Sequence, residues 1–210
     1  MPAARVPRFA TASARSDAGF SLMEVVVALG IILVVMTFSL AFFIRSMQGT
    51  ALQQQRQAAV AVADQAMELT RSVPASKPLT GTVSPLLAGR DESRVDAQWA
   101  SPGSVVTSQS VRQFDPDATS TSMPLVPFST TSVVNNVSYP VRTFVDGCYL
   151  DSTGACGPTP NTHLMYRVTV EVNWQPKADQ SCSGVGGPCA YVVSTLRDPS
   201  PDVSFIQTGP

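Results

Sequence analysis

The sequence predicts an α+β protein in which one long N-terminal helix packs on a small antiparallel β-sheet. Three stretches predict this class: an apolar run from Val25 to Ile44, a helix-forming stretch that continues it to residue 71, and an alternating segment from Tyr166 to Trp174. Helical and strand patterns that follow each other in separate blocks, rather than alternating, are typical of α+β proteins.

The apolar run from Val25 to Ile44 contains no charged residue in twenty positions. A helix rises about 1.5 Å per residue, so a helix of this length covers roughly the 30 Å hydrocarbon core of a bilayer. Hydrocarbon offers backbone groups no partner outside the helix, so a bilayer enforces helix even on this β-branched composition. We therefore expect a membrane-spanning helix over residues 20–45. Gly30 in its middle marks either a close packing contact or a tolerated glycine.

A basic leader, residues 1–19, precedes the apolar run and carries three arginines and one acidic residue. The excess of arginine before the span predicts a cytoplasmic N-terminus and an extracytoplasmic C-terminal part. The leader ends in Gly19, directly before the run, whereas a secretory signal has its small-residue cleavage site after the apolar region. A cleavable secretory signal is therefore a poor fit.

Glu24 is the unusual residue of this region, because it stands at the mouth of the apolar helix. A carboxylate at this position does not help a simple anchor to hold the membrane. Its transfer toward the bilayer costs enough free energy to suggest that the residue has a function. The alternative is a signal anchor in which this carboxylate is incidental.

The stretch Gly19-Phe20-Ser21-Leu22-Met23-Glu24-Val25 and the apolar run behind it resemble the processing site of type IV prepilins and pseudopilins. The resemblance implies that a prepilin peptidase cuts between Gly19 and Phe20 and methylates the new amino group of Phe20. It also implies that subunits leave the bilayer and pack their apolar helices together. Buried in such a core, Glu24 would need a cation, and the resemblance implies that this is the N-terminal amine of a neighbour.

Residues 46–73 predict an amphipathic continuation of the helix, which we expect to run from Phe20 to Ser72. Its apolar side chains recur at spacings of three and four and form a stripe that can pack under the sheet. The expected stripe consists of Leu52, Ala59, Val62, Ala63, Ala66, Met67 and Leu69. Pro74 ends the helix, because the residue before a proline disfavours the helical conformation.

Residues 74–210 predict one extracytoplasmic, β-rich domain. Its first part, 75–136, is rich in Pro, Ser and Thr and predicts a variable loop region, with short strand candidates at 95–99, 105–113 and 133–137. The second part is clearer, because the segment from Tyr166 to Trp174 alternates apolar and polar residues. With neighbours at 138–145 and 190–197 it predicts an antiparallel three-stranded meander within about 138–197.

The four cysteines form two local pairs, Cys148 with Cys156 and Cys182 with Cys189. An even number of cysteines outside the cytoplasm favours disulfides, and neighbours in sequence are the favoured partners among three connectivities. Each small loop would contribute about 2.5 kcal/mol in the chain-entropy model. A zinc site is the competing hypothesis, but spacings of eight and seven residues do not match those of zinc knuckles.

Neither charge nor composition indicates catalysis, a cofactor or nucleic-acid binding. Outside the leader the chain has 11 basic and 14 acidic residues, a formal charge of −3, so no basic excess exists for a nucleic acid. His163 is the only histidine and lacks a free cysteine or a Gly-x-Ser-x-Gly elbow beside it. Asp146 and Asp151 could ligate calcium, but the acidic density of a twelve-residue calcium loop is missing.

The sequence therefore predicts a structural protein and no enzyme: a minor pilin-like subunit of a type IV pilus or a type II secretion pseudopilus. The partners that this resemblance implies are the prepilin peptidase, other pilin or pseudopilin subunits, the inner-membrane assembly platform and, before assembly, the lipid bilayer. The alternative is an uncleaved, single-pass, membrane-tethered binding protein.

Overall fold

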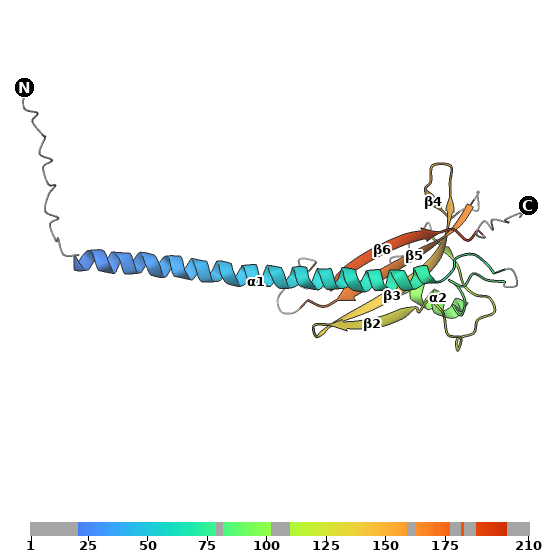
Figure 1. Ribbon diagram of the computed structural model, residues 1–210, viewed down its shortest axis with the longest axis horizontal. Helices are drawn as coiled ribbons and strands as arrows, with labels where there is room; N and C mark the ends of the chain where they lie inside the picture. Colours follow the sequence, from blue (N-terminus) through green and yellow to red (C-terminus); the bar gives the residue numbers. More distant parts are fainter. Residues whose placement is uncertain are drawn as a thin grey trace, which may run out of the picture. The chain divides into compact units, whose positions relative to one another are not determined.

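The computed structural model describes residues 21–78, 82–101, 110–158, 163–176, 182 and 188–200. The chain divides into two compact units, residues 1–47 and 48–210. The elements are α1 (Leu22–Ser72), α2 (Glu92–Trp99), β1 (Val111–Arg112), β2 (Ser129–Val134), β3 (Val137–Leu150), β4 (Cys156–Gly157), β5 (His163–Trp174) and β6 (Cys189–Arg197) (Figure 1). The fold is α+β and type IV pilin-like, with a long N-terminal helix and an antiparallel sheet.

The three central strands form the expected antiparallel meander. Strand β3 pairs with β5, and β5 pairs with β6. The sheet is larger than the sequence predicts, because β1, β2 and β4 all pair with β3 as well. Strand β3 alone runs from Val137 to Leu150, so each half of it has room for a separate short partner on the side away from β5.

One face of the sheet packs on the outer part of α1, residues 48–72. The helix contributes Ala59, Val62, Ala63 and Met67, each 6% exposed or less. The strands contribute Val137, Tyr139, Val141, Val170, Val172, Trp174 and Cys189 to the same cluster. Burial of these side chains is the main favourable term that holds helix and sheet together.

The expected helix stripe is confirmed in its centre and wrong at its end. Ala59, Val62, Ala63 and Met67 are buried, but Leu69 remains 48% exposed. The polar residue Thr70 takes its place in the buried face, because the sheet contacts the helix on a slightly rotated side. The hydroxyl of Thr70 donates to the carbonyl of Met67, which satisfies this buried polar group inside the helix.

Arg197 of β6 contacts the C-terminal end of α1. Its guanidinium donates to the carbonyl oxygens of Thr70 and Val73, both at 3.2 Å. These carbonyls lie at the end of the helix, where the carbonyl of Thr70 also accepts the amide of Val73, and a cation there complements the helix dipole. The contact joins the last strand to the end of the first helix.

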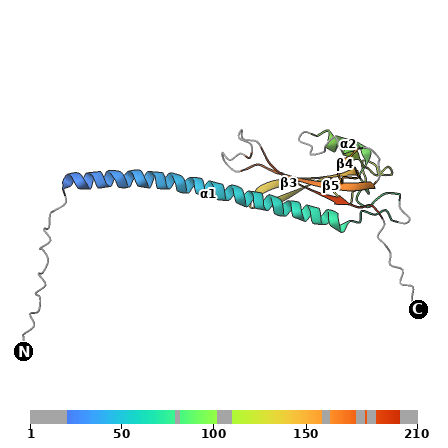
Figure 2. The same cartoon turned by 90° about the horizontal axis from the view of Figure 1, so that it is seen from above.

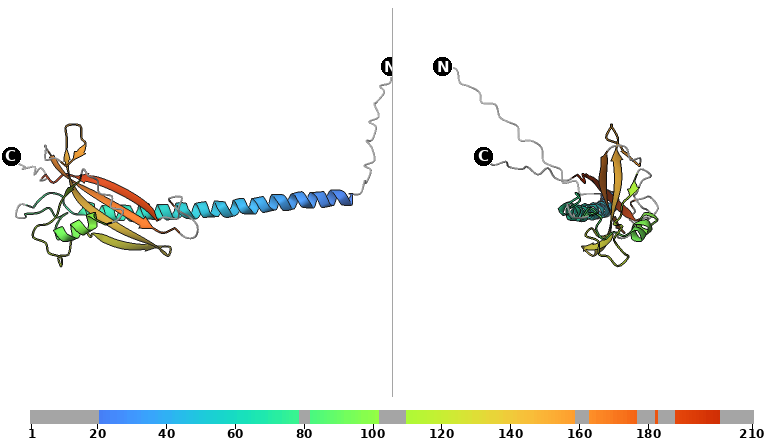
Figure 3. Two further views of the ribbon diagram at one scale, coloured as in Figure 1. Left: turned by 180° about the vertical axis from the view of Figure 1, so that it is seen from behind. Right: turned by 90° about the vertical axis from the view of Figure 1, so that its right-hand side faces the viewer.

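A second helix, α2, lies on the other side of the sheet from α1 (Figures 2 and 3). The strand candidate at 95–99 is therefore wrong, since these residues are helical. Asp91 caps this helix by accepting a hydrogen bond from the amide of Arg94, and only Val95 of the helix is buried. Eight residues with one buried side chain are too short to show a helical period, so the sequence pattern does not distinguish this helix from a short strand.

The remaining strand candidates meet the structure only in part. The candidate at 133–137 spans a turn, because Asn135 and Asn136 have φ of 51° and 60° and join β2 to β3. Such left-handed pairs form the two-residue hairpin turns that match strand twist. Of the candidate at 105–113, Val111 and Arg112 form β1, while residues 105–109 lie outside the described residues.

Candidate functional site

Glu24 lies in the first turn of α1. The amides of Glu24 and Val25 both donate to the carbonyl of Ser21, at 2.9 and 3.3 Å, so the helix begins directly at this residue. The carboxylate is solvent-exposed and stands near the positive end of the helix dipole, where a negative charge is favourable. Gly19 and Phe20, the predicted processing site, lie outside the described residues.

The apolar part of α1 exposes its side chains. Phe38, Phe42 and Phe43 are between 62% and 75% exposed, and none of the described residues from 21 to 50 is buried. The helix is long and apolar enough to cross a membrane. An apolar surface of this extent does not stay in water, so the helix requires lipid or protein around it.

Gly30 sits in this surface without any neighbour. A Cβ atom placed on it would meet nothing within 4 Å, so close packing inside this chain does not explain the glycine. The Thr37 hydroxyl donates to the carbonyl of Leu33, one turn earlier, so this polar group is satisfied within the helix. The surface of the run is therefore apolar and uncharged.

The four cysteines lie in the sheet domain as two disulfides. Cys148 is joined to Cys156 and Cys182 to Cys189, with Cα atoms 5.2 and 5.0 Å apart. Cys148 and Cys189 are buried in strands β3 and β6. The first bridge therefore joins the paired strands β3 and β4, and the second ties Cys182 to the start of β6.

The two aspartates considered for calcium have separate partners. Asp146 lies on β3 in a buried ion pair with Arg167, whose guanidinium donates at 2.6 Å. Asp151 lies in the exposed turn after β3, where its carboxylate accepts hydrogen bonds from Thr153 and from the amide of Ala155. These hydrogen bonds lower the pKa of Asp151, and the bond from the Thr153 hydroxyl has the largest effect.

His163 begins β5 and is exposed. Its Nε2 atom lies 3.5 Å from a carboxylate oxygen of Asp198. The pKa of Asp198 is lowered chiefly by hydrogen bonds from Ser200. The pair is a surface contact between the start of one strand and the end of the sheet.

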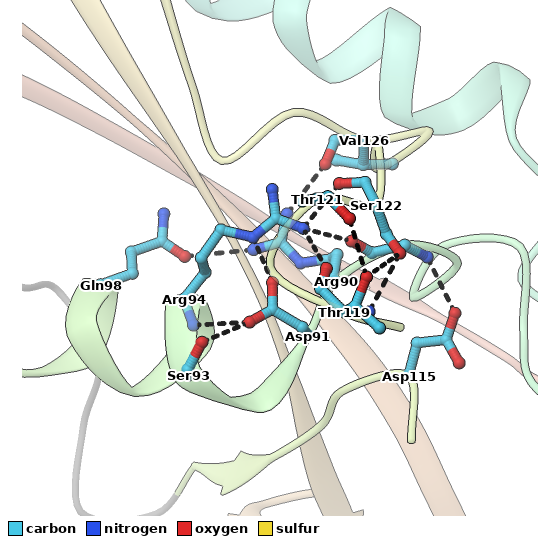
Figure 4. A network of polar contacts seen from close by, with 11 residues as sticks. Arg90, Asp91, Ser93, Arg94, Gln98, Asp115, Thr119, Thr121, Ser122 and Val126 are labelled. Carbon is cyan, nitrogen blue, oxygen red and sulfur yellow. Dashed lines mark hydrogen bonds and ion pairs between the residues drawn. The ribbon is translucent and has the colours of Figure 1, made fainter. Parts of the chain in front are cut away.

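A polar network around Arg90 is the part of the structure that sequence reasoning missed (Figure 4). The Arg90 side chain is almost completely buried and donates to the carbonyls of Val126 and Thr143 and to the side chain of Gln98. Its guanidinium lies over the ring of Phe128, 4.0 Å from the centroid. No carboxylate contacts it among the described residues.

Burial, with the nearby positive charge of Arg94, lowers the pKa of Arg90 to about 9. The neutral partners of Arg90 come from three separate segments, so this one cation orders the loop region against the sheet. Burying a cation without a counter-charge is costly, and its hydrogen bonds and ring contact offset that cost.

Asp91, the next residue in the chain, pairs with Arg94 instead. The Asp91 carboxylate accepts hydrogen bonds from the backbone amide of Arg94 and from the Arg94 guanidinium. Burial opposes ionisation of this carboxyl, but hydrogen bonds from Ser93 and Arg94 outweigh it and lower its pKa to about 2. The spacing Asp91-x-x-Arg94 before a helix was the one signal in the sequence that could have revealed this network.

Two ion pairs lie across strands on the face of the sheet that carries α2. Arg142 faces Glu171 and Asp146 faces Arg167 in the β3–β5 register, with closest atoms 2.7 and 2.6 Å apart. The carboxylate side chains are only 5% and 2% exposed. Removing one member of such a buried pair typically costs about 3–5 kcal/mol, because the other charge stays behind.

Comparison with known proteins identifies the N-terminal segment. Residues 14–40 match the family model described as the prokaryotic N-terminal methylation motif. The chain thus carries the motif that is the hallmark of type IV prepilins and pseudopilins, and it covers Gly19, Phe20, Glu24 and most of the apolar run. Searches of the curated proteins and of the solved structures gave no match.

Proposed function

We propose that this chain is a structural subunit, minor pilin-like, of a type IV pilus or a type II secretion pseudopilus. The observation that carries the proposal is the coincidence of the methylation motif with the first turn of an apolar helix that exposes its side chains. A motif alone could mark a membrane anchor. The helix in addition offers the kind of uncharged surface that packs against copies of itself when subunits leave the bilayer.

In this proposal a prepilin peptidase cuts between Gly19 and Phe20 and methylates Phe20. The protein is held in the cytoplasmic membrane with its N-terminus inside and residues 74–210 outside. It then passes through the inner-membrane assembly platform into an extracellular or periplasmic filament. The minor role is favoured by the long region 75–136, whose described part is irregular apart from α2, β1 and β2.

Glu24 has the assembly role in this proposal. Residues 25–44 offer no cation, so a carboxylate that enters a filament core must find one on another chain. The free amine of a neighbour's Phe20 is the cation that the motif itself supplies.

Mass spectrometry of the mature N-terminus tests the proposal. Expressed with its cognate prepilin peptidase, the chain should begin at methylated Phe20, and Gly19→Trp should block the cut because it fills the site of cleavage. Gly30→Ala is the matched control, since a Cβ at Gly30 meets nothing within 4 Å, and it should be cut as the wild type is. Recovery of the intact chain from Met1 beside active peptidase would contradict the proposal and favour the uncleaved, tethered binding protein.

A further inference from the structure

A groove of about 520 Å³ lies between the outer part of α1 and the strand β2. Its helix wall includes Val62 and Leu69, and its sheet wall includes three consecutive residues of β2, Thr130, Thr131 and Ser132. None of the described residues that line it is charged. Within the sheet, β2 and β6 lie toward opposite margins (Figure 1).

The groove lies over the face of the sheet that packs on α1 and extends to β2, since Val141 and Thr143 of β3 line it together with the three β2 residues. Successive side chains of a strand point to opposite faces, so a hollow over one face would be lined by every second residue. Thr130 pairs with Val141, which belongs to the core under α1, and Thr131 pairs with Pro140 on the other face. Most of the strand lining thus belongs to the face under α1, and the contact with Thr131 shows that the groove also reaches β2 beside its open edge.

The hairpin register identifies which backbone groups this edge presents. The turn Asn135-Asn136 contains two residues, so Val134 and Val137 form the hydrogen-bonded pair that closes it. Hydrogen-bonded and non-hydrogen-bonded pairs then alternate down the hairpin. The amides and carbonyls of Thr130, Ser132 and Val134 accordingly face β3, and those of Ser129, Thr131 and Val133 face outward.

Pro140 supports this register. It pairs with Thr131, an outward-facing position at which β3 donates no amide to β2, so the missing N–H of the proline costs nothing there. In the described part of the chain β2 has β3 as its only strand partner, and the groups of Ser129, Thr131 and Val133 that face outward have no partner.

The edge also lacks the usual protection against pairing. Natural sheets guard their edges with charged residues, prolines or bulges. Strand β2, Ser-Thr-Thr-Ser-Val-Val, contains no charge and no proline, and Val133 is 68% exposed. In the groove beside it, Leu69 of α1 exposes 48% of its surface although it lies on the domain's apolar helix flank.

We propose that the edge of β2 is a docking site for an extended, uncharged segment of another protein chain, which adds to the sheet as a further strand. Its backbone would pair with Ser129, Thr131 and Val133, and alternate side chains would enter the groove and cover Leu69. The extended conformation of the partner follows from the backbone groups that the β2 edge presents. Outward-facing amides and carbonyls pair with a backbone whose own amides and carbonyls are free, and the backbone groups of a helix are already bonded to each other. A groove without charged residues would leave a charged side chain desolvated and unpaired.

Amide hydrogen exchange, followed residue by residue, tests the proposal on the full chain in detergent micelles. The probe is a capped heptapeptide of alternating valine and threonine. At saturation it should slow exchange at Ser129, Thr131 and Val133 at least tenfold, whereas Thr130, Ser132 and Val134 are already bonded to β3 and should change little. Unchanged exchange at the three outward amides would overturn the proposal.

Two variants separate this edge from general stickiness of the peptide. Thr131→Pro removes an outward amide without taking a bond from β3, and Leu69→Glu puts a charge in the groove. Each should weaken peptide binding at least tenfold. Gln57→Glu places the same charge on an exposed position of α1 that does not line the groove, and it should bind as the wild type does.

Wild-type binding by both Thr131→Pro and Leu69→Glu would contradict strand addition. Slowing of the outward amides without peptide, increasing with protein concentration, would also overturn the proposal, because a second copy of the chain would then be the occupant. The proposal does not depend on the assembly of a filament and can fail or succeed separately from it.

Discussion

Glu24 shows how much chemistry one residue can carry on an otherwise uniform helix. It lies in the first turn of α1 and precedes twenty uncharged positions, so any environment that covers the helix must accommodate this charge. The residue and its spacing from Gly19 were readable from the sequence alone. The partner that we propose for its carboxylate lies on another molecule, so one chain's sequence does not display it.

Glu24→Ala should lower incorporation of the subunit into filaments while cleavage and membrane insertion continue. The change removes both the charge and its desolvation cost, so the membrane-bound form loses nothing, but the attraction to a neighbour's amine is gone. The measurement is the amount of this protein in sheared filaments relative to its membrane pool. Glu68→Ala, an exposed carboxylate on the outer part of the same helix, is the control. Equal incorporation of wild type and Glu24→Ala would reject the pairing role.

Asp91 should make the outer domain sensitive to acid. Its folded pKa of about 2 lies below the ordinary aspartate pKa of 3.8, so its contribution to the free energy of unfolding is complete above about pH 4. That contribution is lost as the pH falls from about 4 to 2, because the unfolded chain then binds a proton more readily. Asp91→Asn keeps a good N-cap but removes the charge. The difference in melting temperature between wild type and variant should therefore shrink over this window, and a constant difference would contradict the assignment.

At the scale of elements, a helix or strand could be predicted from the sequence where its apolar residues recur with a clear period. Strands β3, β5 and β6 have long alternating segments and were predicted, whereas α2 has one buried residue, Val95, and gives no period. Strand β2 is mostly exposed and rich in Ser and Thr, so its apolar signal falls at its last two residues beside the turn. The helix stripe was right where the sheet covers it and wrong at Leu69, where the groove begins.

Met67→Ala should destabilise the outer domain by about 2–4 kcal/mol, since large-to-small changes in a packed core lose transfer energy and leave a cavity. Met67 is 2% exposed and lies between α1 and the sheet. Leu69→Ala, two residues later and 48% exposed, is the matched control and should cost less than about 1 kcal/mol. Denaturant unfolding in detergent, followed by the fluorescence of buried Trp174, measures both. Equal losses would show that the sheet does not anchor the helix at Met67.

At the scale of the whole molecule, the order of the elements followed from the sequence, but the links between distant segments did not. Arg90 donates to Thr143 across 53 positions, and no local pattern announces such a bond. The ion pairs between β3 and β5 likewise depend on register, which fixes Arg142 opposite Glu171 only after the strands have paired. Propensity and periodicity are local quantities, so contacts of this kind lie beyond them.

Non-reducing peptide mapping of exported protein should recover Cys148 linked to Cys156 and Cys182 linked to Cys189. Both pairs already have Cα separations of 5.2 and 5.0 Å, which suit a disulfide without backbone movement. Mapping the same protein after reduction and alkylation is the control for adventitious exchange. Cross-paired peptides or four free thiols would contradict the connectivity.

The placement of these disulfides has a mechanical consequence. They close segments of eight and seven residues, so neither bridge reaches α1. Among the described residues, and apart from the backbone that continues after Ser72, side-chain packing and hydrogen bonds such as those from Arg197 to Thr70 and Val73 hold the helix to the sheet. Tension applied along α1 therefore loads this interface in shear, and the helix can slip from the sheet while every covalent cross-link of the outer domain stays intact.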